Sequence, residues 1–227
     1  MSDQTSRPTH IPGTTTPIEY SSGGWPIWAV GGEMIILAPH ATTGAPMFIN
    51  IIRGGEPFKG FVGIPAGHVN PDETTKQGAI RETLEEINVS LTEDQVYLSH
   101  VASKPGRDPN KPCPAIVYWS LVPNMLDVEA GDDAAAVRWS PLADHTEMEF
   151  GFDTADTMKE MIDNVALRAF HDIRLFVDII AAEHSRETAV QFIYQLFQLS
   201  SIEELKNIDI IQVRVKVAHY LANGFVW

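Results

Sequence analysis

The chain of 227 residues is long enough for one domain with an appendage or for two small domains. Its 16 Lys and Arg residues against 30 Asp and Glu residues give a formal charge of −14, which argues against nonspecific binding to nucleic acid or to an anionic membrane. No apolar run approaches the ~20 residues of a membrane-spanning helix, no signal peptide is evident, and the single cysteine, Cys113, excludes an intrachain disulfide, so we expect a cytoplasmic protein.

The first part of the chain predicts a flexible arm followed by strands. Residues 1–17 are rich in Thr, Ser and Pro with few large apolar side chains, which is typical of a flexible arm. Apolar runs at 25–30 and 34–38 flank Gly31-Gly32, and this pattern predicts a hairpin with a Gly-Gly turn. Further strands are expected at 47–52, 61–64, 96–103, 115–122 and 134–139.

A helix is predicted over residues 74–87, and it carries an acidic face. Glu82, Glu85 and Glu86 have helical offsets i, i+3 and i+4, so their side chains share one side of the helix. Such like charges repel unless a cation or an arginine compensates them. Mg²⁺ prefers oxygen ligands and binds through a few carboxylates together with substrate phosphates. The face is therefore either solvated surface or a site that holds metal against a phosphate chain.

The segment 67–89 resembles the Nudix box, in which Gly is followed after five residues by Glu and after seven more by Arg-Glu-apolar-any-Glu-Glu-any-Gly-apolar. The matching residues are Gly67, Glu73, Arg81, Glu82, Glu85, Glu86 and Val89. Thr83 stands where an aliphatic residue is usual, but a β-branched side chain can pack there. Asn88 replaces the Gly that ends the helix, and Asn tolerates a left-handed C-cap.

The resemblance extends over about residues 18–152 and implies an α/β fold, the Nudix α/β/α sandwich with a mixed sheet. It also implies Mg²⁺, with Mn²⁺ as an alternative ion, held by Glu82, Glu85 and Glu86. The backbone carbonyl of Ala66 is implied as a further ligand. By the same resemblance, Gly67 belongs to the substrate-binding loop.

Supporting residues follow from the same family pattern. Glu73 and Arg81 are expected to assist catalysis, with Arg81 pairing with a box carboxylate and fixing its rotamer. An ordinary surface salt bridge is the alternative for both. The general base is a box glutamate or a carboxylate of a later loop, for which Glu147 and Glu149 are candidates.

The substrate class is indicated outside the box. Pro105 lies 16 residues beyond Val89 in a Pro-Gly-Arg-Asp-Pro run that resembles the loop of ADP-ribose pyrophosphatases. This resemblance implies cleavage of ADP-ribose to AMP and ribose 5-phosphate. Arg107 is expected either to reach a phosphate or ribose, or to pair with Asp108 and hold the loop.

Asp132 and Asp133 are interpreted as turn residues rather than metal ligands. Four aromatic residues are candidates to stack on the base, although most are expected in the core: Trp25, Trp28, Phe61 and Trp119.

Residues 153–227 predict a helical C-terminal extension, beginning with apolar residues at 158, 161, 162 and 165. A Nudix-related ADP-ribose sensor with a C-terminal DNA-binding domain is an alternative, as is a Nudix enzyme of other nucleotide specificity. The intact carboxylates argue against the sensor, and so do the ten Asp and Glu against seven Lys and Arg of residues 155–227. We expect packing or self-association of the extension, a homodimer, and a small nucleotide as the partner rather than nucleic acid.

Overall fold

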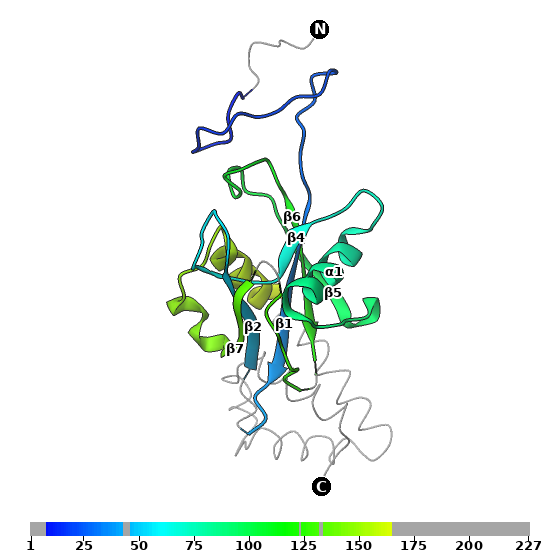
Figure 1. Cartoon of the computed structure of the whole chain (residues 1–227), viewed down its shortest axis with the longest axis vertical. Helices are drawn as coiled ribbons and strands as arrows, with labels where there is room; N and C mark the ends of the chain where they lie inside the picture. The colour runs from blue at the N-terminus through cyan, green and yellow to red at the C-terminus, as the bar shows by residue number, and fades with distance from the viewer. Residues whose placement is uncertain (1–7, 43–45, 123, 132–133, 165–227) are drawn as a thin grey trace, which may run out of the picture.

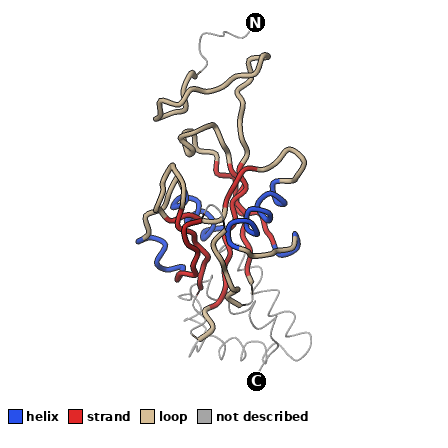
Figure 2. The backbone as a smooth tube through the Cα atoms, viewed as in Figure 1, coloured by secondary structure: helices blue, strands red, loops and turns tan. Residues whose placement is uncertain are grey.

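The computed structural model describes residues 8–42, 46–122, 124–131 and 134–164. A mixed sheet forms its centre, with helices beside it (Figures 1 and 2). The strands are β1 (Gly31–Pro39), β2 (Pro46–Arg53), β3 (Val62–Gly63), β4 (Ala66–His68), β5 (Val96–Ala102), β6 (Ala115–Leu121) and β7 (Ala134–Pro141). The helices are α1 (Thr75–Ile87) and the short 3₁₀ turns η2 (Glu93–Gln95) and η3 (Leu142–Glu147), and the chain is also helical over residues 154–164.

β1 is the central strand of the sheet. It runs antiparallel to β2 and β4 on one side and parallel to β6 on the other. The main order is β3-β2-β1-β6-β5, while β7 continues from β2. The parallel pair among antiparallel ones confirms the mixed sheet expected from the sequence.

Both faces of β1 are buried, because successive side chains of a strand point to opposite sides. Met34 and Ile36 belong to the buried cluster that includes residues of α1. Ile35 and Leu37 belong to a second cluster, which includes Met158 of the 154–164 helix. One helix therefore covers each face of the sheet, and the predicted α/β/α sandwich is confirmed.

The helix α1 has caps at both ends that its sequence encodes. The Thr74 side chain accepts from the backbone N–H of Gln77, and the Gln77 side chain accepts from the Thr74 N–H, which completes a capping box. At the other end Asn88 has φ of 55° and its N–H is donated to carbonyls of the last turn. Thr83 is fully buried and its hydroxyl donates to the Ala79 carbonyl. Both departures from the Nudix pattern are thus accommodated as expected.

The predicted Gly-Gly hairpin is wrong. Gly31 and Gly32 lie inside β1, paired with β4 and β6, and residues 25–30 form no strand. A Cβ on Gly32 would lie 3.0 Å from the backbone nitrogen of Ala79 in α1. Gly32 therefore allows close approach of strand and helix, and Gly31 lies against Ala115 of β6, so neither glycine forms a turn. β4, at residues that we expected to form a loop, is a strand missing from the prediction.

The described part of the N-terminal arm contacts the loop between β5 and β6. Ile11 is buried, and the Thr16 hydroxyl donates to the Pro109 carbonyl at 2.7 Å. Residues 1–7 of the predicted arm lie outside the described residues. Figure 1 shows the segment leading to β1 extending away from the sheet.

The first helix of the predicted extension packs on the sheet. Met158 and Met161 are fully buried, and Ile162 packs beside them. The later helical positions, from Val165 onward, lie outside the described residues. Within the part of the chain that is described, no helix is long and apolar enough to cross a membrane.

Candidate active site

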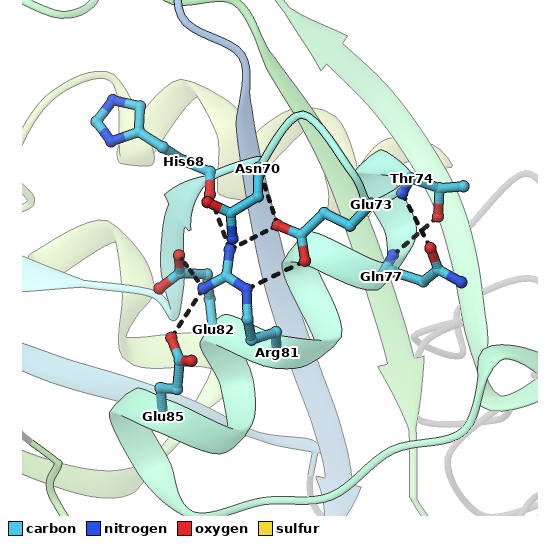
Figure 3. Close-up of polar contacts among 8 residues, drawn as sticks. All are labelled: His68, Asn70, Glu73, Thr74, Gln77, Arg81, Glu82 and Glu85. Carbon is cyan, nitrogen blue, oxygen red and sulfur yellow. Dashed lines mark hydrogen bonds and ion pairs between the residues drawn. The ribbon is translucent and has the colours of Figure 1, made fainter.

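Arg81 is the centre of the acidic face of α1 (Figure 3). Its guanidinium donates to Glu73 at 2.7 and 3.1 Å, to Glu82 at 2.7 Å and to Glu85 at 2.8 Å. A further N–H donates to the His68 carbonyl at 2.9 Å. The expected pairing of Arg81 with a box carboxylate is therefore present, and it extends to three carboxylates and to the end of β4.

Glu73 is the carboxylate most strongly affected by this arrangement. Hydrogen bonds from Arg81, and then the bond from the backbone N–H of Asn70, lower the pKa of Glu73 to about 2. The group is thus ionised throughout the neutral range. It holds the guanidinium from the side opposite Glu85, so Arg81 is fixed between the loop before α1 and the helix itself.

The box carboxylates touch the backbone of β4. A Cβ on Gly67 would lie 2.0 Å from the carboxyl carbon of Glu82, so only glycine leaves room for that carboxylate. Glu86 accepts the backbone N–H of Ala66 at 3.0 Å. Glu85 points more to solvent, since its side chain is 57% exposed. Glu82, Glu86 and the adjacent Ala66 backbone offer oxygen donors only, which suits a hard divalent ion such as Mg²⁺.

The β4 backbone at Ala66 and Gly67, together with Glu82 and Glu86, lines a cavity of about 540 Å³. That volume lies within the range of small-molecule sites. The described residues lining it include Glu33, Arg53, Glu56, Ala66, Gly67, Arg81, Glu82, Glu86, Arg107 and Phe152. Glu85, Glu147 and Glu149 are not among the lining residues. The structure therefore brings most of the box to the cavity and leaves the two loop candidates for the general base away from it.

Arg107 joins three separate segments at this cavity. It donates two hydrogen bonds to Asp153, at 2.7 and 2.9 Å, and one to Glu33 of β1. A fourth bond reaches the Cys113 carbonyl at 3.2 Å. The expected pairing with Asp108 is not the one formed. Arg107 does hold its loop, but through β1 and the residue that precedes the 154–164 helix.

Glu33 has an unusual environment for a carboxyl group. Burial raises its pKa above the usual range, and the neighbouring Arg107 opposes that shift. One carboxyl oxygen faces Arg107, whereas the other is buried without a hydrogen-bond partner among the described residues. A carboxyl group within an apolar strand is the sequence signal that marks this residue.

The aromatic candidates are mostly at the surface, contrary to expectation. Trp25 and Trp28 are 76% and 57% exposed, and Phe61 is also exposed. Only Trp119 is in the core, stacked on Tyr97. The short-range sequence around each Trp does not reveal exposure, because burial depends on distant segments. Trp25 and Trp28 line a second cavity, of about 400 Å³, together with Pro105.

Phe152 and Arg53 are site residues that the sequence did not indicate. The Arg53 guanidinium lies 4.7 Å from the centre of the Phe152 ring, and both side chains line the first cavity. They come from the end of β2 and from the segment before the 154–164 helix. Nothing local in either segment distinguishes them from ordinary surface residues.

The loop 129–131 is hydrogen-bonded to the C-terminal end of α1. Its N–H groups at Gly131 and Glu129 donate to the carbonyls of Glu86 and Ile87. A Cβ on Gly131 would lie 1.9 Å from the carbonyl oxygen of Glu85. Asp132 and Asp133, interpreted from the sequence as turn residues, lie outside the described residues.

Comparison with known proteins agrees with the box and the fold. The NUDIX domain family matches residues 41–162, more than half of the chain. This chain belongs to the Nudix family. An ADP-ribose pyrophosphatase of Methanocaldococcus jannaschii is 33% identical over 105 residues, which is 44% of this chain and 57% of the relative. The match to this chain thus spans little more than half the length of that relative.

Solved structures share the Nudix fold at low sequence identity. A MutT/nudix family protein from Enterococcus faecalis has a TM-score of 0.60 and 19% identity, covering 92% of this chain and 85% of its own. The NUDIX domain of NrtR from Shewanella oneidensis, solved in complex with ADP ribose, has a TM-score of 0.55 and 19% identity, covering 63% of this chain and 91% of its own. At this identity the likeness concerns the fold alone.

Proposed function

We propose that this Nudix protein is a divalent-metal-dependent pyrophosphohydrolase acting on a nucleoside diphosphate linked to another moiety, with ADP-ribose as its substrate and AMP and ribose 5-phosphate as products. The observation that carries the proposal is the contact of Glu82 and Glu86 with the Ala66–Gly67 backbone at the wall of a substrate-sized cavity. Mg²⁺ or Mn²⁺ fits this oxygen-only donor set.

The residues have separable roles in this proposal. Glu82 and Glu86, with the Ala66 carbonyl, would hold the ion. A bound ion would neutralise phosphate charge and lower the pKa of a coordinated water molecule. Arg81 holds the Glu82 carboxylate and the β4 backbone in position. A box glutamate remains a candidate general base. Glu56, which lines the cavity, replaces Glu147 and Glu149 as the candidate from a loop.

Support for ADP-ribose comes from relatives and from the resemblance of the run at Pro105 to the loop of ADP-ribose pyrophosphatases, while Pro105 itself lines the second cavity. The Methanocaldococcus relative is an ADP-ribose pyrophosphatase, and the NrtR domain was solved with ADP ribose. Arg107 is engaged by Asp153 and Glu33, so we assign it to shaping the cavity wall rather than to phosphate binding. Arg53, which lines the same cavity, is the cation that we propose faces the substrate.

A substrate panel tests the proposal. With saturating Mg²⁺, kcat/KM is compared for ADP-ribose, NADH, diadenosine polyphosphates and 8-oxo-dGTP. We expect ADP-ribose to be preferred. A clear preference for a triphosphate would refute the substrate assignment and leave the hydrolase assignment intact. Hydrolysis of none of them would contradict the enzymatic proposal.

A sensor is the second candidate, favoured by the fold likeness to NrtR, which has also been solved with a 27mer DNA. The acidic balance of residues 155–227 opposes it. Binding of the full chain to its own promoter DNA, measured with and without ADP-ribose, separates the two. Tight, sequence-selective binding released by ADP-ribose would favour the sensor, and hydrolysis without such binding favours the enzyme.

A further inference from the structure

Three side chains with metal-ligand chemistry meet on the cavity wall outside the Nudix box. They are His68 at the end of β4, and Asp108 and Cys113 in the loop between β5 and β6. Their nitrogen, oxygen and sulfur ligand atoms all lie within 4.8 Å of one another. All three residues line the same cavity as Glu82 and Glu86. No role for them follows from the box or from the proposed reaction.

We propose that His68, Asp108 and Cys113 form a second metal site, selective for a thiophilic divalent ion such as Zn²⁺. Imidazole, carboxylate and thiolate are the three ligand types that Zn²⁺ takes in proteins, and three protein ligands leave its fourth tetrahedral position open. That position would face the cavity, which the three residues line.

The separation of the ligand atoms is close to what the ion requires. In a tetrahedral site with bonds of 2.0–2.3 Å the ligand atoms lie about 3–4 Å apart. A spread of up to 4.8 Å therefore closes by side-chain rotation. His68 is exposed and free to turn, and Figure 3 shows its ring pointing away from Arg81 and its carboxylates.

The backbone that carries the ligands is already fixed. Arg81 binds the His68 carbonyl, and Arg107 binds the Cys113 carbonyl at 3.2 Å. The Asp108 carboxylate accepts the backbone N–H of Asn110 at 2.7 Å, which orients its side chain. Prolines on both sides of Cys113 restrict the chain further. Ligands on such anchored segments need little ordering when the ion binds.

The site differs from the Glu82–Glu86 site in the ions that it selects. A thiolate and an imidazole are poor ligands for Mg²⁺, which prefers oxygen, but good ones for Zn²⁺ and Co²⁺. Excess Mg²⁺ should therefore saturate the carboxylate site and leave the His68–Asp108–Cys113 site to the softer ion.

Co²⁺ binding to the full chain in excess Mg²⁺ tests the inference without reference to catalysis. Cys113 is the chain's single cysteine, so a thiolate-to-Co²⁺ charge-transfer band in the near ultraviolet reports on it alone. We expect the band to saturate at one Co²⁺ per chain and to disappear when Zn²⁺ displaces the Co²⁺. Absence of the band at saturating Co²⁺ would overturn the proposal.

Variants identify the other ligands. His68→Ala and Asp108→Ala should each weaken Co²⁺ binding by at least ~10-fold, on the scale of losing a metal-supporting contact. His145→Ala is the matched control, because that ring bonds the Leu142 carbonyl in η3 and should leave the titration unchanged. Unchanged Co²⁺ affinity in both His68→Ala and Asp108→Ala would contradict the site. Far-ultraviolet circular dichroism confirms that each variant is folded.

Discussion

At the level of single residues, the site depends on two arginines and a glycine that position acidic groups. Arg81 organises the carboxylates of α1, and Arg107 links Glu33 to Asp153. Gly67 leaves the space that the Glu82 carboxylate occupies. The sequence spacing predicted the first group because helical offsets are local. It could not predict Arg107's partners, because they come from β1 and from a segment 46 positions along the chain.

Gly67→Ala should reduce activity far more than stability. The new Cβ would displace the Glu82 carboxylate, and a misplacement of about 1 Å can lower kcat by ~100-fold. The carboxylate is the end of a flexible side chain, so folding should tolerate the shift. We expect a fall in kcat with little change in the free energy of unfolding in urea. Wild-type kcat in this variant would show that the position of Glu82 is not critical.

Asp153→Asn should destabilise the fold. It removes one of the two carboxylates paired with Arg107, whose side chain is only 9% exposed, and we expect a loss of about 1–3 kcal/mol in the free energy of unfolding. Asp156→Asn is the matched control, since Asp156 makes an exposed pair with Lys104 at 3.4 Å and its loss should cost no more than about 0.5 kcal/mol. Equal effects in urea unfolding would contradict a structural role for the Arg107 bridge.

At the level of elements, α1 was predictable and β1 was not fully so. The capping box of Thr74 and Gln77 and the left-handed Asn88 are local signals, and they set both ends of the helix. Gly31 and Gly32 have the local sequence signal of a turn, but in the structure Gly32 leaves room for α1 and Gly31 leaves room for Ala115 of β6. A glycine pair does not by itself distinguish these two demands, because the deciding contact is not local.

Gly131→Ala tests the contact between the loop 129–131 and the C-terminal end of α1. The added Cβ would clash with the carbonyl oxygen of Glu85, so the backbone of the loop or of α1 has to move. We therefore expect a loss of about 1–3 kcal/mol in the free energy of unfolding. Gly55→Ala is the comparison, because nothing lies within 4 Å of its Cβ position. Urea denaturation curves measure both. A Gly131 variant as stable as the Gly55 variant would show that the loop 129–131 is not tightly packed against α1.

At the level of the whole molecule, the sequence predicted the fold and one wall of the cavity. The other lining residues, including Glu33, Arg53 and Phe152, come from segments that carry no common motif. Packing of the 154–164 helix on the sheet likewise joins the predicted extension to the core. Such placement depends on tertiary contacts that a local pattern does not contain.

The full chain should form a homodimer. Trp25, Ile27 and Trp28 are each more than half exposed, and a cluster of large apolar side chains on a surface favours burial against another protein. Closed two-fold pairs are the commonest oligomers. Multi-angle light scattering should therefore give twice the 25.1 kDa of one chain. A monodisperse species at the mass of one chain would contradict this prediction.

Hydrolysis of ADP-ribose by carboxylate variants tests the central claim most directly. Production of AMP is followed at saturating Mg²⁺ for the wild type, Glu82→Gln and Glu86→Gln, with Glu93→Gln as the control because Glu93 bonds Gln77 away from the cavity. The account predicts at least a ~100-fold loss of kcat in both box variants and near-wild-type activity in the control. Near-wild-type rates in Glu82→Gln and Glu86→Gln would contradict the assigned site.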